Sequence, residues 1–231
     1  MRTPRNIMVL DTETVGTYGS PLVHDIGYVI LSKGEIVCKK RFLVKELHVN
    51  GKWILDTSDF YQGYKKDYAK ARKQEMILPF GEIIKELWSD VRKYSVSCIS
   101  AYNLKFDITA LKYSEKFFCN SQKIISKIEK KKLLCLWNLA CETIGQTAQF
   151  IQWAYENGCI KPESGNIITS AEIMYRYVTN DTSYIECHTA LNDALDESEI
   201  FKYIKKNFKG SCDYGLKNNC WMKVQKNRID K

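Results

Sequence analysis

Two carboxylates near the N-terminus have the spacing of a metal-binding pair. Asp11 and Glu13 follow the apolar run 7–10, which predicts a buried strand. Because side chains two residues apart on an extended chain point to the same side, both carboxylates would meet at the strand end. A divalent cation that prefers oxygen ligands, such as Mg²⁺ or Mn²⁺, neutralises the repulsion between them. The pair predicts a metal-dependent phosphoryl-transfer site, although by itself it fits a solvated strand end equally well.

Three further residues could complete such a site. Asp107 follows a short predicted strand over 96–101 and lies at the start of a predicted helix, with Asn103 as a suitable cap. His188 and Asp193 lie at the beginning of the last strong amphipathic helix, predicted over 189–206. With His188 on the loop that enters this helix and Asp193 in its second turn, both side chains could face one point in space.

The size and composition indicate one globular domain with appendages. The chain has 231 residues, of which 45% are apolar, enough for a substantial core. We expect no membrane span and no secretory signal, because no long uninterrupted apolar run is present, and the default expectation is a cytoplasmic protein. The nine cysteines include no Cys-x-x-Cys pair, so they are interpreted as reduced thiols.

Positive charge is concentrated at the C-terminal end. Residues 202–231 hold nine Lys or Arg and two Asp or Glu, a balance of +7 out of a total of +8. A basic tail on a nearly neutral body suits polyanion binding, because each phosphate contact releases counterions. A solubilising tail is an equally good interpretation of the same residues.

The order of the predicted elements indicates an α/β fold. A hairpin over 26–44 follows the first strand, so strands one to three should be antiparallel. Pro79 opens a helix, and later strands alternate with helices, which predicts a mixed five-stranded sheet with parallel later strands. The remaining predictions are a strand at 133–136 and helices at 137–144, 148–156 and 170–178.

Residues 45–78 are rich in lysines and aromatic residues, and they are the best candidate for a lid. Such a mixture can bind a single strand by stacking and charge, but a helix that buries one aromatic stripe is favoured slightly. Asp25 could support the acidic site from behind its ligands, although a surface or turn position is favoured, and Asp196 and Glu197 are expected to be solvated.

Three segments together resemble the motifs of the DEDDh (DnaQ-like) 3′–5′ exonucleases, a family with an RNase H-like fold. They are Asp11-Thr12-Glu13-Thr14, residues 103–107 (NLKFD) and residues 188–193 (HTALND), and they occur in the family's order. Thr189 disfavours the subtypes that have tyrosine four residues before the last Asp. Val15 departs from the Thr or Ser of many members. The resemblance covers residues 6 to about 206, which implies an exonuclease domain at 1–206 with an insertion at 45–78, and a basic tail at 207–231.

The resemblance implies a reaction that uses two Mg²⁺ or Mn²⁺ ions. Asp11 would bridge both ions, Glu13 and Asp193 would complete the site of the ion that serves the nucleophile, and Asp107 would hold the second ion. His188 would accept the proton of the attacking water, since histidine changes charge near neutral pH. The product would be a nucleoside 5′-monophosphate.

The resemblance also implies how a nucleic-acid strand would bind. Backbone amides around Thr14 and Val15 would contact the 3′-terminal nucleotide, and the segment with Asn103 and Phe106 would flank its base. The leading expectation is action on 3′ ends of single-stranded DNA in replication, repair or nucleotide recycling, with a DNA polymerase as a possible partner. The alternatives are an exoribonuclease and a non-catalytic, polymerase-associated subunit. Residues 186–191 (ECHTAL) are similar to those of bacteriophage-encoded members, which would place the protein in the host cytoplasm.

Overall fold

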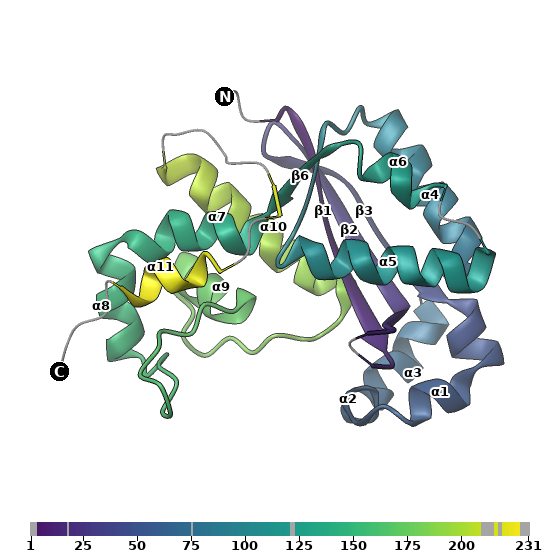
Figure 1. Ribbon diagram of the computed structural model, residues 1–231, viewed down its shortest axis with the longest axis horizontal. Helices are drawn as coiled ribbons and strands as arrows, with labels where there is room; N and C mark the ends of the chain where they lie inside the picture. Colours follow the sequence, from purple (N-terminus) through teal and green to yellow (C-terminus); the bar gives the residue numbers. More distant parts are fainter. Residues whose placement is uncertain are drawn as a thin grey trace.

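A six-stranded mixed sheet forms the centre of the molecule (Figure 1). The computed structural model describes residues 4–17, 19–74, 76–120, 123–208, 215–216 and 219–226. The strand order is β4-β3-β2-β1-β5-β6; the first three strands pair antiparallel, and β5 and β6 run parallel to β1. This confirms the predicted mixed α/β fold. The strands are β1 (Asn6–Val15), β2 (Leu22–Ser32), β3 (Glu35–Val44), β4 (Met76–Leu78), β5 (Cys98–Ala101) and β6 (Lys132–Cys135).

The predicted count of five strands is wrong by one. The additional strand is β4, which pairs parallel with the end of β3, Val44 opposite Leu78. It has only three residues and lies at the sheet edge, where none of its side chains is fully buried. Such a short, partly exposed strand gives no alternating hydrophobic pattern by which the sequence could reveal it.

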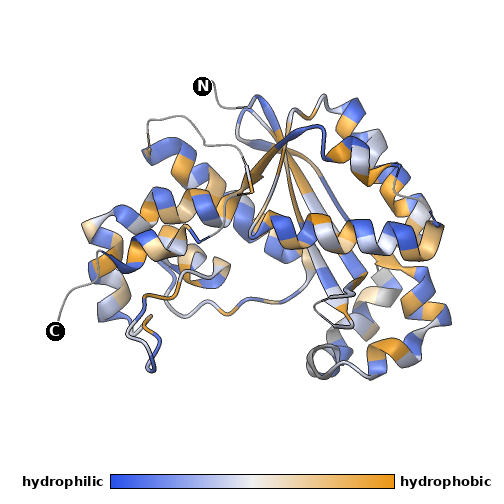
Figure 2. Ribbon diagram, in the orientation of Figure 1, coloured by the Kyte–Doolittle hydropathy of each residue, from blue (hydrophilic) through white to orange (hydrophobic). Residues whose placement is uncertain are grey.

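Helices cover both faces of the sheet, and β1 shows why. Met8 and Leu10 face one apolar cluster, whereas Ile7 and Val9 face the other, as the two-residue period of a strand requires. In Figure 2 the apolar residues gather along the strands and on one side of many helices. The first face carries α4 (Phe80–Lys93), α5 (Leu104–Cys119) and α6 (Ile125–Ile128); the second carries α7 (Leu136–Glu142), α8 (Ala148–Glu156), α9 (Ala171–Thr179) and α10 (Ala190–Asn207), with the short 3₁₀ helix η2 (Ile144–Gln146).

The segment 45–78 forms a small helical unit beside the end of β3. The favoured interpretation, a helix that buries an aromatic stripe, is correct in part: Tyr61 and Tyr68 are fully buried, but they lie on two different short helices. Their rings pack on His24 and His48, which are also buried. The unit consists of η1 (Glu46–Asn50), α1 (Lys52–Asp56), α2 (Asp59–Gly63) and α3 (Lys65–Gln74).

Helix α10 crosses the sheet at close range. A Cβ atom on Gly27 of β2 would lie 2.2 Å from the backbone of Ala190, so only glycine permits this approach. Asp25 fixes the same place: its carboxylate accepts two hydrogen bonds from Arg41 Nε at 3.0 and 3.1 Å and one from the backbone N–H of Ala190 at 3.3 Å. The surface or turn role predicted for Asp25 is therefore wrong, because its charge is buried and paired with Arg41.

Part of the C-terminal region packs on the body of the protein. The short helix α11 (Trp221–Gln225) contacts α7, and Cys220 and Val224 are buried there. Gln225 accepts a hydrogen bond from the backbone N–H of Ile167 and donates one to its carbonyl oxygen. Cys212 lies outside the described residues, and the cysteines within them are free thiols. Among the described residues, no helix is both long and apolar enough to cross a membrane.

Candidate active site

The four predicted acidic residues meet at the end of β1. Asp11 and Glu13 lie on that strand, whereas Asp107 and Asp193 lie in the first turns of α5 and α10. Burial and the negative charges of Asp107 and Glu13 raise the pKa of Asp11 well above its ordinary value. Thr12, between the two strand carboxylates, donates a 2.9 Å hydrogen bond from Oγ1 to Asp107 Oδ1. Residues almost a hundred positions apart are thereby joined into one acidic site.

His188 belongs to the same site. One nitrogen of His188 and one carboxylate oxygen each of Glu13 and Asp193 lie within 4.8 Å of one another. Burial, together with the charges of Glu186 and Glu13, raises the pKa of Asp193. This group of three residues has a spacing that can hold a metal ion.

Burial and mutual repulsion dominate the electrostatics of the site, and the charge of Arg41 offsets them only in part at Glu13. Burial raises the pKa of Asp107 to about 8 and that of Asp193 to about 9, with repulsion from Glu186 and Glu13 adding to the shift at Asp193. Burial, followed by repulsion from Asp25, raises the pKa of Glu13 to about 7. Carboxyl groups in this state take up protons near neutral pH unless a cation replaces those protons.

A fifth carboxylate, Glu197, faces the site from α10. Glu197 is only 2% exposed, so the predicted solvated position is wrong. Burial and the nearby charge of Asp107 raise its pKa well above the ordinary value. The position four residues after Asp193 was a usable signal, because such residues share one helix face. Asp196 is not fully solvated either, since it is half-buried and accepts a hydrogen bond from the Tyr184 hydroxyl.

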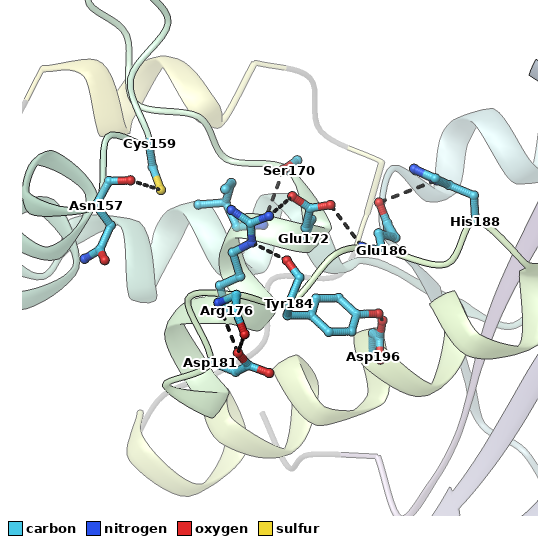
Figure 3. A network of polar contacts seen from close by, with 12 residues as sticks. Asn157, Cys159, Ser170, Glu172, Arg176, Asp181, Tyr184, Glu186, His188 and Asp196 are labelled. Carbon is cyan, nitrogen blue, oxygen red and sulfur yellow. Dashed lines mark hydrogen bonds and ion pairs between the residues drawn. The ribbon is translucent and has the colours of Figure 1, made fainter. Parts of the chain in front are cut away.

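A chain of polar contacts holds the loop that carries His188 (Figure 3). Arg176 of α9 pairs with Glu172 at 2.7 Å and donates from Nε to the Tyr184 carbonyl oxygen. Glu172 in turn accepts the backbone N–H of Glu186 at 3.0 Å. The Glu186 carboxylate lies 3.7 Å from His188 Nδ1. His188 has a φ of +50°, a conformation that an ordinary residue adopts only when its surroundings hold it there.

Tyr64, from the helical unit at 45–78, also reaches the site. Its ring contacts the imidazole of His188 edge-on, with 5.2 Å between ring centres. Burial and the charges of Glu13, Glu186 and Asp193 raise the pKa of its hydroxyl. The tyrosine lies more than a hundred residues from His188 in sequence, and nothing in the local pattern distinguishes it from its aromatic neighbours.

The residues predicted to contact substrate occupy different environments. Val15 is buried in the cluster between the sheet and the helical unit, and its backbone pairs with Leu22, so its side chain faces away from solvent. Thr14 is half-buried, just after an irregularity in the β1–β2 pairing. Asn103 occupies the N-cap position of α5, but its φ is +66° and its side chain makes no capping hydrogen bond. Phe106 is half-buried one residue before Asp107.

The donor set fits divalent cations with oxygen ligands. Asp193 Oδ1 and Glu197 Oε2 are buried and have no hydrogen-bond partner within the described residues. A buried, unpartnered carboxylate oxygen is costly, and coordination of a cation removes that cost. Carboxylates and one imidazole suit Mg²⁺ or Mn²⁺, and they also suit Zn²⁺.

Comparisons with known proteins define the class of fold. No known family model matches the sequence, and no curated protein matches it either. The structure is similar to E. coli exonuclease I in complex with a dA16 oligonucleotide (TM-score 0.52, 15% identity, 87% of this chain and 41% of that chain). It is also similar to exonuclease I without ligand (0.52, 14%, 88% and 42%) and to exonuclease X with 5′ overhanging duplex DNA (0.44, 16%, 87% and 92%).

The likeness to exonuclease I establishes the fold. The mixed sheet with antiparallel strands β1 to β3 and helices on both faces is the RNase H-like fold of exonucleases. The chain spans about two fifths of the length of exonuclease I.

Proposed function

We propose that this protein is a divalent-metal-dependent 3′–5′ exonuclease of the DEDDh type that acts on single-stranded DNA. The observation that carries the proposal is the meeting of Asp11, Glu13, Asp107 and Asp193 with His188 at the end of β1. Acids from three separate segments lie together, with Asp107 and Asp193 buried, at a cost that bound protons or cations offset. A purely structural role would not favour such an arrangement.

The residues have distinct roles in the proposed reaction. Asp11, Glu13, Asp107 and Asp193 would hold the divalent cations, which would supply Lewis-acid stabilisation of the phosphodiester oxygens. His188 accepts the proton of the attacking water, and the carboxylate of Glu186 stabilises the charge that the imidazole then carries. Thr12 holds Asp107 by its hydrogen bond, so that this carboxylate stays oriented toward the other acids. The phosphodiester is cleaved to release a nucleoside 5′-monophosphate.

Single-stranded DNA is the proposed substrate for two reasons. Structures similar to this one contain exonuclease I with dA16 and with dT13 oligonucleotides. The net charge of +8 favours a polyanionic partner in general.

An exonuclease I structure with zinc also exists, and the donor set here accepts the same class of ion. The division into a domain at 1–206 and a basic tail, a polymerase partner and an origin in a bacteriophage stay predictions.

The decisive experiment follows the two ends of one strand. Purified protein with Mn²⁺ should shorten a 5′-labelled single strand stepwise, whereas a 3′-labelled strand should release labelled mononucleotide from the start. EDTA and the Asp107→Asn variant should abolish both results. An unchanged DNA strand together with an unchanged RNA strand of the same sequence would refute the proposal, and cleavage of RNA alone would identify an exoribonuclease.

A further inference from the structure

A cavity lies at the C-terminal ends of β5 and β6, lined in part by Tyr102 and Trp137. It has a volume of about 550 Å³. Tyr102 directly follows β5, and Trp137 is the second residue after β6. Because β1, β5 and β6 run parallel, both residues lie at the same end of the sheet as Asp11, beyond the C-terminal ends of the strands. Trp221 and Gln225 of α11, Lys161 and Thr169 complete the part of the lining that matters here.

The rings in this cavity are held in fixed orientations. The Tyr102 and Trp137 rings are stacked at 29° with 6.5 Å between centres. The Tyr102 hydroxyl donates to the Thr169 carbonyl oxygen at 2.6 Å, and Trp137 Nε1 donates to Thr169 Oγ1 at 3.0 Å. With their polar atoms satisfied by one residue, the rings present apolar surface, and all three aromatic residues are only partly buried. A preformed aromatic surface binds a flat ring with little loss of side-chain entropy.

The cavity is connected to the acidic site through Tyr102. Tyr102 directly follows β5, which pairs in parallel with β1 (Val9 opposite Ser100), and the next residue, Asn103, begins the segment that leads to Asp107. Lys161, which also lines the cavity, is exposed. A strand whose 3′ end lies among the carboxylates could therefore continue past Tyr102 toward a positive charge.

We propose that this cavity binds one nucleotide of the single strand upstream of the scissile bond, with its base on the Tyr102–Trp137–Trp221 surface and its phosphate beside Lys161. The proposal rests on the proposed function, which supplies the strand. The volume is within the range that holds one small organic ligand. Stacking on aromatic rings accepts any base, and a lysine recognises the phosphate without reading sequence, so the cavity would add affinity but no sequence preference.

The test measures binding separately from cleavage. In the Asp107→Asn background without added metal, the dissociation constant of a 5′-fluorescein (dT)₁₀ strand is measured by anisotropy. Trp221→Leu and Lys161→Glu should each raise it about tenfold, in the range of one lost stacked base or phosphate contact. Phe117→Leu is the matched control and should bind normally, because Phe117 lies near the C-terminal end of α5, is 59% exposed and does not line the cavity. Lys161 is an exposed residue, so its variant remains informative even if Trp221→Leu disturbs the packing of α11.

An abasic scan then locates the nucleotide. Single abasic sites are placed at successive positions from the 3′ end. At one position, the loss of the base should raise the dissociation constant of the protein that retains Trp221 about tenfold. The same loss should not raise the dissociation constant of Trp221→Leu any further. Equal losses with and without Trp221 at every position, or unchanged binding by Lys161→Glu, would overturn the cavity assignment. If the wild-type protein cleaves DNA and these variants bind normally, only the cavity assignment fails. If the wild-type protein does not cleave DNA, but one abasic position weakens binding only when Trp221 is present, only the exonuclease assignment fails.

Discussion

Replacing Asp107 by Asn should stabilise the metal-free protein while it abolishes activity. The side chain of Asp107 is 2% exposed, and burial raises its pKa from 3.8 to about 8. In the unfolded chain at pH 7 this carboxyl group is ionised, so folding must either bury the charge or take up a proton. The gap of about three pKa units between pH 7 and the unfolded value corresponds to about 4 kcal/mol as an upper limit. Asparagine avoids this cost, and its Oδ1 can still accept the hydrogen bond from Thr12.

The effect must follow pH in one direction. Because the folded-state pKa is raised, the wild-type protein carries no penalty below the unfolded value near pH 4 and loses stability as the pH rises through about 8. Neighbouring carboxyl groups share the protons that are taken up, so the full cost is not reached. We therefore expect the free energy of unfolding of Asp107→Asn to exceed that of the wild-type protein by about 2 kcal/mol at pH 8, which corresponds to roughly 4–8 °C in melting temperature for a chain of this size. The two proteins should melt together at pH 4.

Thermal melts in EDTA from pH 4 to pH 9 measure this difference, with Asp56→Asn as the control. Asp56 is exposed, and its hydrogen bond from Lys65 lowers its pKa, so its replacement should give no gain. Mn²⁺ should raise the melting temperature of the wild-type protein by neutralising the acids, and it should raise that of Asp107→Asn much less. An Asp107→Asn protein that melts at or below the wild-type temperature at pH 8 without metal would refute the reasoning.

Three further changes test individual side chains. His188→Gln should reduce the rate of strand shortening by at least about a hundredfold while the Mn²⁺-induced rise in melting temperature is largely kept; equal loss of both would show that His188 acts mainly as a ligand. Glu197→Gln should raise the melting temperature of the metal-free protein at pH 8 by a few degrees, because it removes a buried charge among like charges; a fall would mean that the charge is compensated. Tyr64→Leu should slow strand shortening several-fold and Tyr64→Phe should not, since the contact with His188 is made by the ring; equal rates would assign Tyr64 no role.

The motif with Asp11 and Glu13 and the one with Asp193 could be recognised from the sequence, because the residues of each motif lie close together in the chain. Asp11 and Glu13 are two positions apart on a strand, and the strand could be recognised from four apolar residues. The helix that carries Asp193 was equally clear, since Ala194, Phe201 and Ile204 recur on one face and are buried as predicted. The sequence by itself therefore predicted the α/β class, the antiparallel first strands and the candidate acids.

Tertiary structure decided which charged residues are buried together. Asp25 and Glu197 look like ordinary polar residues in their local segments, yet one is paired with Arg41 under the close crossing of α10 and the other faces Asp107. Tyr64 meets His188 only because the helical unit at 45–78 packs beside β3. Local patterns record the face of a strand or helix on which a residue lies, but the burial of a charge depends on the elements that pack against that face. Those elements come from distant parts of the chain, and only the folded structure brings them together.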